Sequence, residues 1–308
     1  MQNLHHHQSI ITLYARAAAI YHDTLGNMAN VERDAMQLMF MTDLDGTLLG
    51  HEGFSFAAIR SGIHDLLRAG IMLVPNSSKT AREIDAFCGE LGAPLPFICE
   101  NGAALINRRL MDLPPAPDAS DVVGVAPDRL MTLWDRHVDP MLQRHCRFLS
   151  ELTEAEQAWH LGLRGQALKL AMKRDYSAPF IFSGTEKDFR DVLCQAADGG
   201  LAIQRGGRVC NLSARHGKAG FNSGLRTEYR AASRDLVIVG FGDSDNDIDM
   251  LEDSDIACVV PRPGSPPLTL AAPPPTVITA QQAAPEGWLE AAFQALSIIE
   301  RERGETNG

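Results

Sequence analysis

The sequence predicts an α/β fold: a doubly wound, parallel-sheet (Rossmann-like) core that carries an inserted α/β cap domain. Short apolar runs alternate with helical patterns near both ends of the chain, which is typical of a parallel sheet. Between these regions the alternation stops, and helices with a small hairpin take its place. Two acidic clusters, at 43–47 and 242–247, each directly follow an apolar run.

The composition limits the class of protein. The chain has 308 residues, of which 45% are hydrophobic and 22% charged, as in globular proteins of one large or two ordinary domains. Its net charge of −11 argues against a general nucleic-acid binder, which needs a basic face. No apolar run is long enough for a membrane span. A small molecule is therefore the expected partner, and the sequence indicates no oligomeric state.

The cysteines predict the compartment. All six are scattered, and none forms a C-x-x-C pair. Scattered cysteines of this kind are typical of buried thiols in a reducing environment. The N-terminus lacks the basic region of a signal peptide. We therefore expect a cytoplasmic protein.

The first part of the chain holds an extension and half of the core. Residues 1–36 are expected to form an N-terminal extension, with a helix over 8–25 that ends at Gly26-Asn27. The core strands and helices that follow are expected at 37–42, 55–69, 71–74, 80–91 and 96–99. Gly70 and Gly92 end the two helices, because glycine readily adopts the left-handed conformation of a helix C-cap.

The middle of the chain is expected to form the cap, over 112–212. It begins with a linker rich in Pro, Ala and Asp at 112–127 and continues with a helical region over 128–160, in which Thr153 and Glu156 are spaced for a capping box. The remaining cap elements are expected to be a strand at 179–182, a helix at 185–197, and a hairpin formed by 201–203 and 208–212.

The alternation then resumes and completes the core, which is expected to comprise 37–111 and 213–300. Helices are expected over 217–230 and 286–300, strands at 236–239 and 256–260, and a tail at 301–308.

Polar residues follow three of the expected strands directly. Asp43, the segment 76–78 and Asp243 each come at the end of an apolar run. Because ligands of open α/β sheets bind beyond the carboxyl ends of the strands, these residues should converge at one edge. Five aspartates would then meet there, at positions 43, 45, 243, 245 and 247. That much charge requires a cation, and all-oxygen ligands favour Mg²⁺.

Such a site suits phosphoryl transfer. One carboxylate can attack phosphorus, and a second, two residues on, can serve as the acid and base. Ser77 or Ser78 could supply a hydroxyl for the phosphate oxygens. Each motif alone has an ordinary interpretation: a D-x-D turn, a solvated or calcium-binding loop at 242–247, or a helix cap at 77–79. Their order and their placement after three strands favour catalysis.

These residues resemble the haloacid dehalogenase superfamily of phosphatases. D-L-D-G-T-L at 43–48, Ser77, and G-D-S-D-N-D at 242–247 match its motifs, and the insertion resembles the α/β cap of its sugar-phosphatase branch. Further segments resemble the mannosyl-3-phosphoglycerate phosphatase family within it. These segments are S-S-K-T-x-x-E-I at 77–84, E-N-G-A-A at 100–104, K-R-D-Y-S-A-P-F at 173–180, R-G-G-R at 205–208 and E-G-W at 286–288.

The resemblance implies a role for each motif residue. Asp43 would be the nucleophile, Asp45 the general acid and base, and Ser77 a phosphate ligand. Mg²⁺ would be surrounded by Asp43, the Asp45 backbone carbonyl, Asp243 and Asp247, with Asn246 nearby.

The basic motif departs from the family, which has a Lys just before a Gly at the start of the helix after the cap. Here the order is His216-Gly217-Lys218. Three alternatives remain: His216 works in its protonated form, Lys218 reaches the site from a non-helical turn, or Lys79 or Arg215 compensates.

The resemblance also implies a substrate with a carboxylate, a phosphate and a sugar. Arg174, Arg205 and Arg208 could bind the carboxylate bidentately or be ordinary surface arginines. Glu100 and Asn101 could bind sugar hydroxyls or cap a turn. Three further substrate-binding candidates complete the set, namely Ser78, Lys79 and Ser177.

The predicted function is that of a Mg²⁺-dependent phosphomonoester hydrolase acting through an aspartyl-phosphate intermediate. The resemblance implies mannosyl-3-phosphoglycerate as the substrate and mannosylglycerate as the product. One alternative is another sugar-phosphate phosphatase, acting on glucosyl-3-phosphoglycerate, sucrose phosphate or a hexose phosphate. A second is a weakly catalytic protein that binds a phospho-ligand, which the presence of His216 would favour.

Overall fold

The computed structural model describes residues 36–113, 120–206, 208–266 and 268–306, so the helix expected over 8–25 lies outside the described residues. The chain divides into two compact units, one made of Met1–Val74 and Ser223–Gly308 and the other of Pro75–Asn222. Both expected cap boundaries, at 112 and 212, fall inside the second unit.

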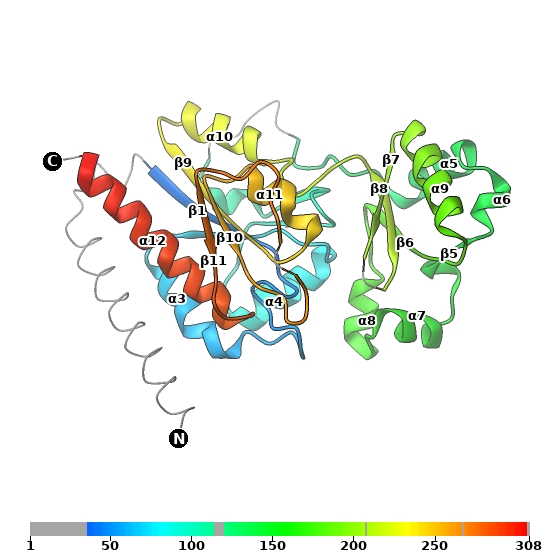
Figure 1. Cartoon of the computed structure of the whole chain (residues 1–308), viewed down its shortest axis with the longest axis horizontal. Helices are drawn as coiled ribbons and strands as arrows, with labels where there is room; N and C mark the ends of the chain where they lie inside the picture. Colours follow the sequence, from blue (N-terminus) through cyan, green and yellow to red (C-terminus); the bar gives the residue numbers. More distant parts are fainter. Residues whose placement is uncertain (1–35, 114–119, 207, 267, 307–308) are drawn as a thin grey trace, which may run out of the picture. The chain divides into compact units, whose positions relative to one another are not determined.

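A five-stranded sheet organises the first unit, with the strand order β11-β10-β9-β1-β2 (Figure 1). Its strands are β1 (Met36–Thr42), β2 (Met72–Pro75), β9 (Asp235–Gly242), β10 (Ile256–Val259) and β11 (Thr276–Thr279). β9 pairs in parallel with both β1 and β10, and β10 pairs in parallel with β11. The predicted α/β fold with a parallel sheet is confirmed. The short edge strand β11 was not predicted, because only one of its four residues is buried.

Helices cover both faces of this sheet. They are η1 (Ala57–Ile59), α3 (Arg60–Arg68), α10 (Asn222–Ala231), η4 (Asp245–Asp247), α11 (Ile248–Glu252) and α12 (Glu286–Thr306). Phe241 in β9 packs against Trp288 in α12, with ring centroids 5.2 Å apart. A Cβ at the neighbouring Gly240 would meet Ser254, which lies just after α11. Successive strand residues point to opposite faces, so α12 and α11 lie on opposite sides of β9.

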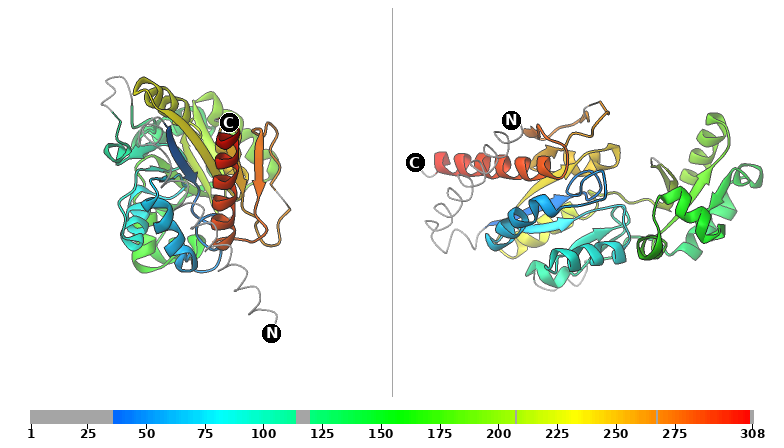
Figure 2. Two further views of the ribbon diagram at one scale, coloured as in Figure 1. Left: turned by 90° about the vertical axis from the view of Figure 1, so that its left-hand side faces the viewer. Right: turned by 90° about the horizontal axis from the view of Figure 1, so that it is seen from below.

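The terminal helix is longer than expected. α12 continues to Thr306, whereas a tail was expected from residue 301 (Figure 2). Leu296 and Ile299 are buried, with 5% and 9% exposure, and anchor the later turns on the unit. Extending an anchored helix fixes few further dihedrals per hydrogen bond, so the polar residues after 300 propagate it.

The second unit contains two antiparallel sheets, β3-β4 and β5-β6-β8-β7. Its strands are β3 (Phe97–Cys99), β4 (Ala104–Ile106), β5 (Cys146–Phe148), β6 (Ser177–Phe182), β7 (Leu201–Arg205) and β8 (Cys210–Ala214). Its helices are α4 (Ala81–Leu91), η2 (Arg108–Met111), α5 (Pro127–His137), α6 (Pro140–Gln143), η3 (Leu149–Glu151), α7 (Glu154–Leu161), α8 (Gly165–Ala171) and α9 (Glu186–Asp198). The predicted β7–β8 hairpin is confirmed.

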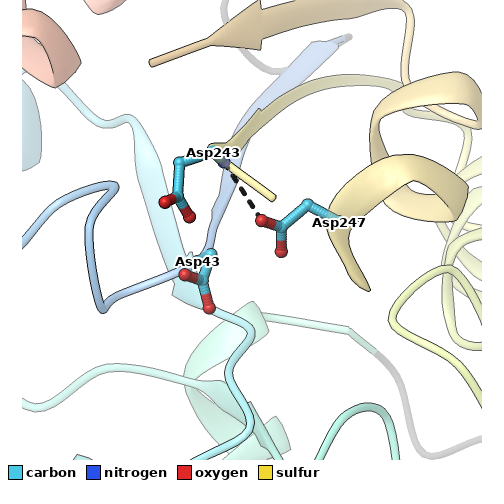
Figure 3. Close-up of side chains that lie close together, drawn as sticks. All are labelled: Asp43, Asp243 and Asp247. Carbon is cyan, nitrogen blue, oxygen red and sulfur yellow. Dashed lines mark hydrogen bonds between the residues drawn. The ribbon is translucent and has the colours of Figure 1, made fainter. Parts of the chain in front are cut away.

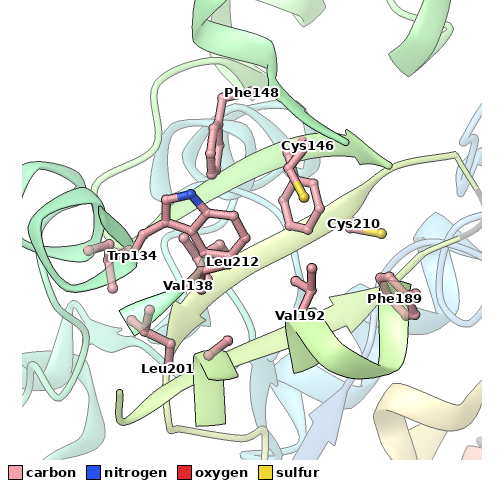
Figure 4. Close-up of a cluster of buried hydrophobic side chains, with 12 residues drawn as sticks. Trp134, Val138, Cys146, Phe148, Phe189, Val192, Leu201, Cys210 and Leu212 are labelled. Carbon is pink, nitrogen blue, oxygen red and sulfur yellow. The ribbon is translucent and has the colours of Figure 1, made fainter. Parts of the chain in front are cut away.

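The core of the second unit lies on the four-stranded sheet (Figure 4). Trp134 from α5 packs edge-on against Phe148 from β5, with ring centroids 5.6 Å apart, and Phe180 from β6 lies 5.4 Å from Phe148. Aromatic clusters of this kind bury large apolar areas. α9, which supplies Phe189 and Val192 to this core, begins at the threonine cap Thr185, and the predicted Thr153–Glu156 capping box at the start of α7 is confirmed.

Three expectations about local structure were wrong. The helical region at 128–160 is interrupted by β5, in which buried Cys146 and Phe148 flank exposed Arg147, a strand alternation too short to recognise in the sequence. β3 pairs with β4 in a separate sheet and has only an isolated parallel bridge, between Ile98 and Asn76. The helix expected from 217 begins at Asn222, because the residues before it form turns.

The cysteines are unpaired thiols, and five of the six are buried. Burial raises the pKa of Cys88 to about 11 and that of Cys99 and Cys146 to about 12. These thiols are therefore uncharged and unreactive near neutral pH. Within the described ranges, no helix is both long and apolar enough to cross a membrane.

Candidate active site

The two strand-end aspartates lie side by side in the first unit. Thr42 is paired with Phe241, and the backbone N–H of Asp43 donates to the carbonyl of Phe241 at 3.0 Å. Asp43 therefore leaves β1 where Asp243 leaves β9. Both residues are buried, with exposures of 5% and 6%. The convergence of these carboxylates follows from parallel pairing, as the sequence predicted.

Asp247 completes a group of three carboxylates (Figure 3). It lies in η4, and its Oδ2 accepts hydrogen bonds from the backbone N–H of Asp243 and of Ser244, each at 3.1 Å. The side chains of Asp43, Asp243 and Asp247 point toward one another, and each offers an oxygen that lies within 4.8 Å of the others. Among the described residues, this group could hold a metal ion.

The electrostatics of this group fit a cation. Burial and the nearby Asp247 charge raise the pKa of Asp243 above its usual value, and the Arg262 and His51 charges oppose that rise. Three buried carboxylates repel one another unless positive charge compensates them. An all-carboxylate donor set suits a hard divalent ion.

Two glycines give the carboxylates room. Gly46 has φ +85°, and a Cβ there would lie 2.7 Å from Oδ2 of Asp243. At Gly242 a Cβ would lie 2.4 Å from the Cβ of Asp247. Larger residues at either position would displace a carboxylate, so the glycines in both motifs serve a packing purpose.

Asp45 lies in the tight turn after β1, which is closed by the backbone N–H of Gly46 donating to the carbonyl of Leu49 at 2.9 Å. Asp45 is half-buried, and its side chain is not part of the three-carboxylate group. The family resemblance assigns only its backbone carbonyl to the metal, so the two observations are compatible.

Two residues that contact Asp243 were missed by the sequence reasoning. Arg262 Nε donates to Asp243 Oδ2 at 3.0 Å, and Thr47 Oγ1 donates to Oδ1 at 3.3 Å. Thr47 belongs to the D-x-D-G-T motif, so the motif itself was a signal. Arg262 lies in a proline-rich loop after β10, and nothing in its local sequence indicates a link to Asp243.

The basic residues after β8 lie in the second unit and have different environments. Lys218 is 1% exposed and lies in a turn ahead of α10, where its carbonyl accepts a hydrogen bond from Asn76 Nδ2 at 2.7 Å. His216 Nε2 donates to the carbonyl of Glu100 at 3.1 Å, and burial lowers the pKa of His216 below 6.5. His216 is therefore neutral near pH 7, which favours the alternative in which Lys218 acts from a non-helical turn.

Lys79 and Arg215, which were considered as substitutes, have partners of their own. Lys79 Nζ lies 3.9 Å from Glu83 in an ion pair, and Arg215 donates to the carbonyl of Ala197. A compensating role for Lys79 or Arg215 therefore stays a prediction.

Ser77 is fully buried and is not the cap of α4. The backbone N–H of Ser77 donates to Ile98 at 3.1 Å, and its Oγ accepts from the N–H of Lys79 at 3.3 Å. Thr80 occupies the N-cap in a complete capping box. The helix-cap interpretation of the serine segment therefore does not hold for Ser77.

Several of the predicted substrate-binding residues bind one another. The Glu100 carboxylate is fully buried. Its donors are the N–H of Asp175 at 2.8 Å, the N–H of Tyr176 at 3.2 Å, and the Ser177 hydroxyl. Arg174 Nη1 donates to the carbonyl of Ser78 at 3.1 Å and to Ser177 Oγ at 3.2 Å. The structure thus brings Ser78, Glu100, Arg174 and Ser177 into one network that ties the loop after β3 to the start of β6.

The other three candidates lie in different surroundings. Asn101 has φ +60° in the turn after β3, which agrees with the turn interpretation. Arg205 forms an ion pair with Glu186 at 2.9 Å, and Arg208 donates to the carbonyl of Leu161 at 2.6 Å. Neither arginine joins the Glu100 network in the described part of the chain.

The Glu100 network should contribute measurably to stability. Glu100→Gln places an amide N–H₂ where the carboxylate accepts from N–H and O–H donors, and a lost charged hydrogen bond costs about 2 kcal/mol. We expect the free energy of unfolding to fall by about that much in urea titrations. Glu151→Gln, at an exposed position, should change it by less than about 0.5 kcal/mol. Equal stability of the two variants would contradict a structural role for Glu100.

Comparison with known proteins shows which families the chain resembles. A family model described as haloacid dehalogenase-like hydrolase matches residues 40–111. A glucosyl-3-phosphoglycerate/mannosyl-3-phosphoglycerate phosphatase from Persephonella marina is 29% identical over 275 residues, which cover 86% of this chain and 99% of that protein. A protein of the same description from Methanococcoides burtonii is 28% identical over 234 residues, covering 74% of this chain and 86% of that protein.

Solved structures show the same fold. A phosphatase of the haloalkanoate enzyme superfamily from Bacteroides thetaiotaomicron superposes with a TM-score of 0.56 at 17% identity, covering 89% of this chain and 98% of that one. A haloacid dehalogenase-like hydrolase from the same organism has a TM-score of 0.56 at 16% identity, covering 84% of this chain and 99% of that one. With the parallel sheet and the carboxylates at the ends of β1 and β9, these findings support a phosphatase that resembles the haloacid dehalogenase-like hydrolases and, over most of its length, the glucosyl-3-phosphoglycerate/mannosyl-3-phosphoglycerate phosphatases.

Proposed function

We propose that the protein is a Mg²⁺-dependent phosphomonoesterase that hydrolyses mannosyl-3-phosphoglycerate to mannosylglycerate and phosphate. The observation that carries this proposal is the buried group formed by Asp43, Asp243 and Asp247 at the ends of two parallel strands. Persephonella marina and Methanococcoides burtonii proteins described as phosphatases of glycosyl-3-phosphoglycerates support the choice of substrate.

The proposed reaction has two steps. An Asp43 carboxylate oxygen attacks phosphorus, the bond from phosphorus to the leaving oxygen breaks, and Asp45 donates the proton that this oxygen takes up. Asp45 then accepts a proton from water, and the water oxygen attacks phosphorus and releases Asp43 and orthophosphate. Ser77 and Lys218 are proposed to bind phosphate oxygens, on the strength of the motif resemblance and of their burial.

The proposed metal site consists of Asp43, Asp243, Asp247 and the Asp45 carbonyl. When bound, Mg²⁺ would neutralise the carboxylates and draw charge from the phosphate oxygens. The raised pKa of Asp243 is compatible with this site, because burial and the neighbouring Asp247 charge disfavour the ionised carboxylate, which a bound cation would stabilise.

The substrate assignment admits one close competitor. Both relatives are named for glucosyl- as well as mannosyl-3-phosphoglycerate, so the glucosyl conjugate is the second candidate. Roles in binding the sugar and glycerate remain predictions for Ser78, Lys79, Glu100, Asn101, Arg174, Ser177, Arg205 and Arg208. A cytoplasmic location is likewise proposed, in keeping with the six free thiols.

A substrate panel tests this proposal. We expect kcat/KM with Mg²⁺ to be at least about tenfold higher for the two glycosyl-3-phosphoglycerates than for sucrose phosphate or a hexose phosphate, since the extra carboxylate adds a charged contact. Phosphate release is measured with and without EDTA. A preference for hexose phosphates would defeat the substrate assignment. Binding without turnover of any ester would favour the phospho-ligand binding protein.

A further inference from the structure

Arg262 joins an exposed guanidinium to the buried carboxylate group. It lies in the loop after β10, and its Nε donates to Asp243 Oδ2 at 3.0 Å. The Asp243 side chain is 0% exposed, whereas that of Arg262 is 44% exposed. The guanidinium therefore has one end fixed at the acidic group and the other end in contact with solvent.

Only part of this guanidinium is used. Among the described residues, the contact with Asp243 is its sole hydrogen bond or ion pair, and it is made by Nε. Both Nη groups remain available as donors. A guanidinium has five N–H donors in one plane, so the unused ones form a fork with a fixed direction.

The backbone around Arg262 is constrained. Pro261 and Pro263 flank it, and each proline fixes its own φ. The N–H of Val260 donates to the carbonyl of Gly242 at 2.9 Å, which ties the start of the loop to the end of β9 beside Asp243. The backbone that carries Arg262 is thus constrained, and the ion pair with Asp243 orients its guanidinium.

We propose that Arg262 binds an oxyanion of the substrate through its Nη groups while Nε holds Asp243. This inference rests on the proposed phosphatase function, whose substrates are anionic. The three carboxylates repel such a substrate, and a cation attached to one of them offsets that repulsion. The oxyanion is either the phosphoryl group or a carboxylate, because the planar fork fits both in a bidentate manner.

Arg226 provides a matched control in the same unit. Its Nη1 donates to Asp255 Oδ2 at 2.9 Å and to the carbonyl of Leu236 at 3.2 Å, and its Nη2 donates to the carbonyl of Asp253 at 3.1 Å. Arg226 also pairs with an aspartate, but both of its Nη groups already have protein partners. Its replacement should affect stability without affecting anion binding.

The experiment compares Arg262→Gln, Arg262→Lys and Arg226→Gln in the full chain at saturating Mg²⁺. Orthophosphate affinity is measured by calorimetry, and KM and kcat are measured for an aryl phosphate and for glycosyl-3-phosphoglycerates. Loss of the fork should weaken anion binding about tenfold or more, with a smaller change in kcat. Arg262→Lys keeps a positive charge next to Asp243 but lacks the planar fork, so its affinity for orthophosphate should also fall. This variant tests the inference if Arg262→Gln is unstable. Arg226→Gln should match the wild type in every binding constant.

Each outcome has a distinct meaning. Weaker orthophosphate binding in both Arg262 variants assigns the fork to the phosphoryl group. A KM that rises only for the phosphoglycerate conjugates assigns it to their carboxylate. Unchanged constants in a folded Arg262 variant overturn the inference. If the wild type hydrolyses no phosphomonoester, the proposed function fails, while the calorimetric comparison still tests Arg262.

Discussion

Asp43→Asn is expected to reduce Mg²⁺-dependent phosphate release from an aryl phosphate by a factor of about 10⁴ or more, because an amide cannot form the acyl phosphate. Asparagine has nearly the shape of aspartate, and the backbone hydrogen bond from residue 43 to Phe241 does not depend on the side chain. The fold should therefore survive, which circular dichroism and the melting temperature can verify.

Loss of metal binding must be separated from loss of the nucleophile. Asp43 belongs to the three-carboxylate group, so rates are compared at saturating Mg²⁺. Asp249→Asn serves as a control, since Asp249 is an exposed aspartate two residues after Asp247. It should leave turnover unchanged. Undiminished turnover in Asp43→Asn would rule out the proposed mechanism.

Lys218→Met should have the second-largest effect. Methionine fills a similar volume in this buried turn but has no charge for the phosphate, so kcat/KM should fall about 10²- to 10³-fold. His216→Lys should retain or raise activity, because the family has a lysine in that register. A large loss in His216→Lys together with normal activity in Lys218→Met would reverse the two assignments.

The pH profile separates the same two residues. If protonated His216 supplied the positive charge, activity would fall as the pH rises through the pKa of His216, which burial holds below its usual 6.5. Such an enzyme would already be losing activity below neutral pH. A mechanism through Lys218 predicts no histidine-dependent fall between pH 6 and 8. A decline in that range that disappears in His216→Lys would favour the histidine.

Sequence reasoning located the acidic part of the site because two simple rules apply there. Short apolar runs form buried strands, and the carboxyl ends of parallel strands meet at one edge of the sheet. The apolar runs that end in Asp43 and Asp243 were expected to be strands whose ends converge at one edge of a parallel sheet, and the structure shows the two strands paired in parallel. Lys218 was harder to place, because the sequence pattern predicted that it lies in a helix. In the structure it lies in the turns before Asn222 instead. Local sequence could not decide between a helix and a turn at Lys218.

Long-range contacts were beyond prediction. Arg262 contacts Asp243 from a loop whose course depends on tertiary packing. The buried carboxylate of Glu100 accepts hydrogen bonds from residues 175–177, which lie far from it in the sequence. The resemblance associated Glu100 and Ser177 with the substrate, which stays a prediction, and the structure adds that the two residues bind each other. A motif can thus identify neighbouring residues correctly without revealing which partner each one holds.

The close approach at Gly46 has a consequence for how the sequence can vary. The space beside this glycine is filled by the His51 ring and by a carboxylate oxygen of Asp243, which comes from a segment nearly 200 residues later in the sequence. The missing side chain at position 46 of the first acidic motif therefore leaves the space that the Asp243 carboxylate of the second motif occupies. A side chain at position 46 would meet both His51 and Asp243, so a substitution in the first motif would disturb a carboxylate of the second.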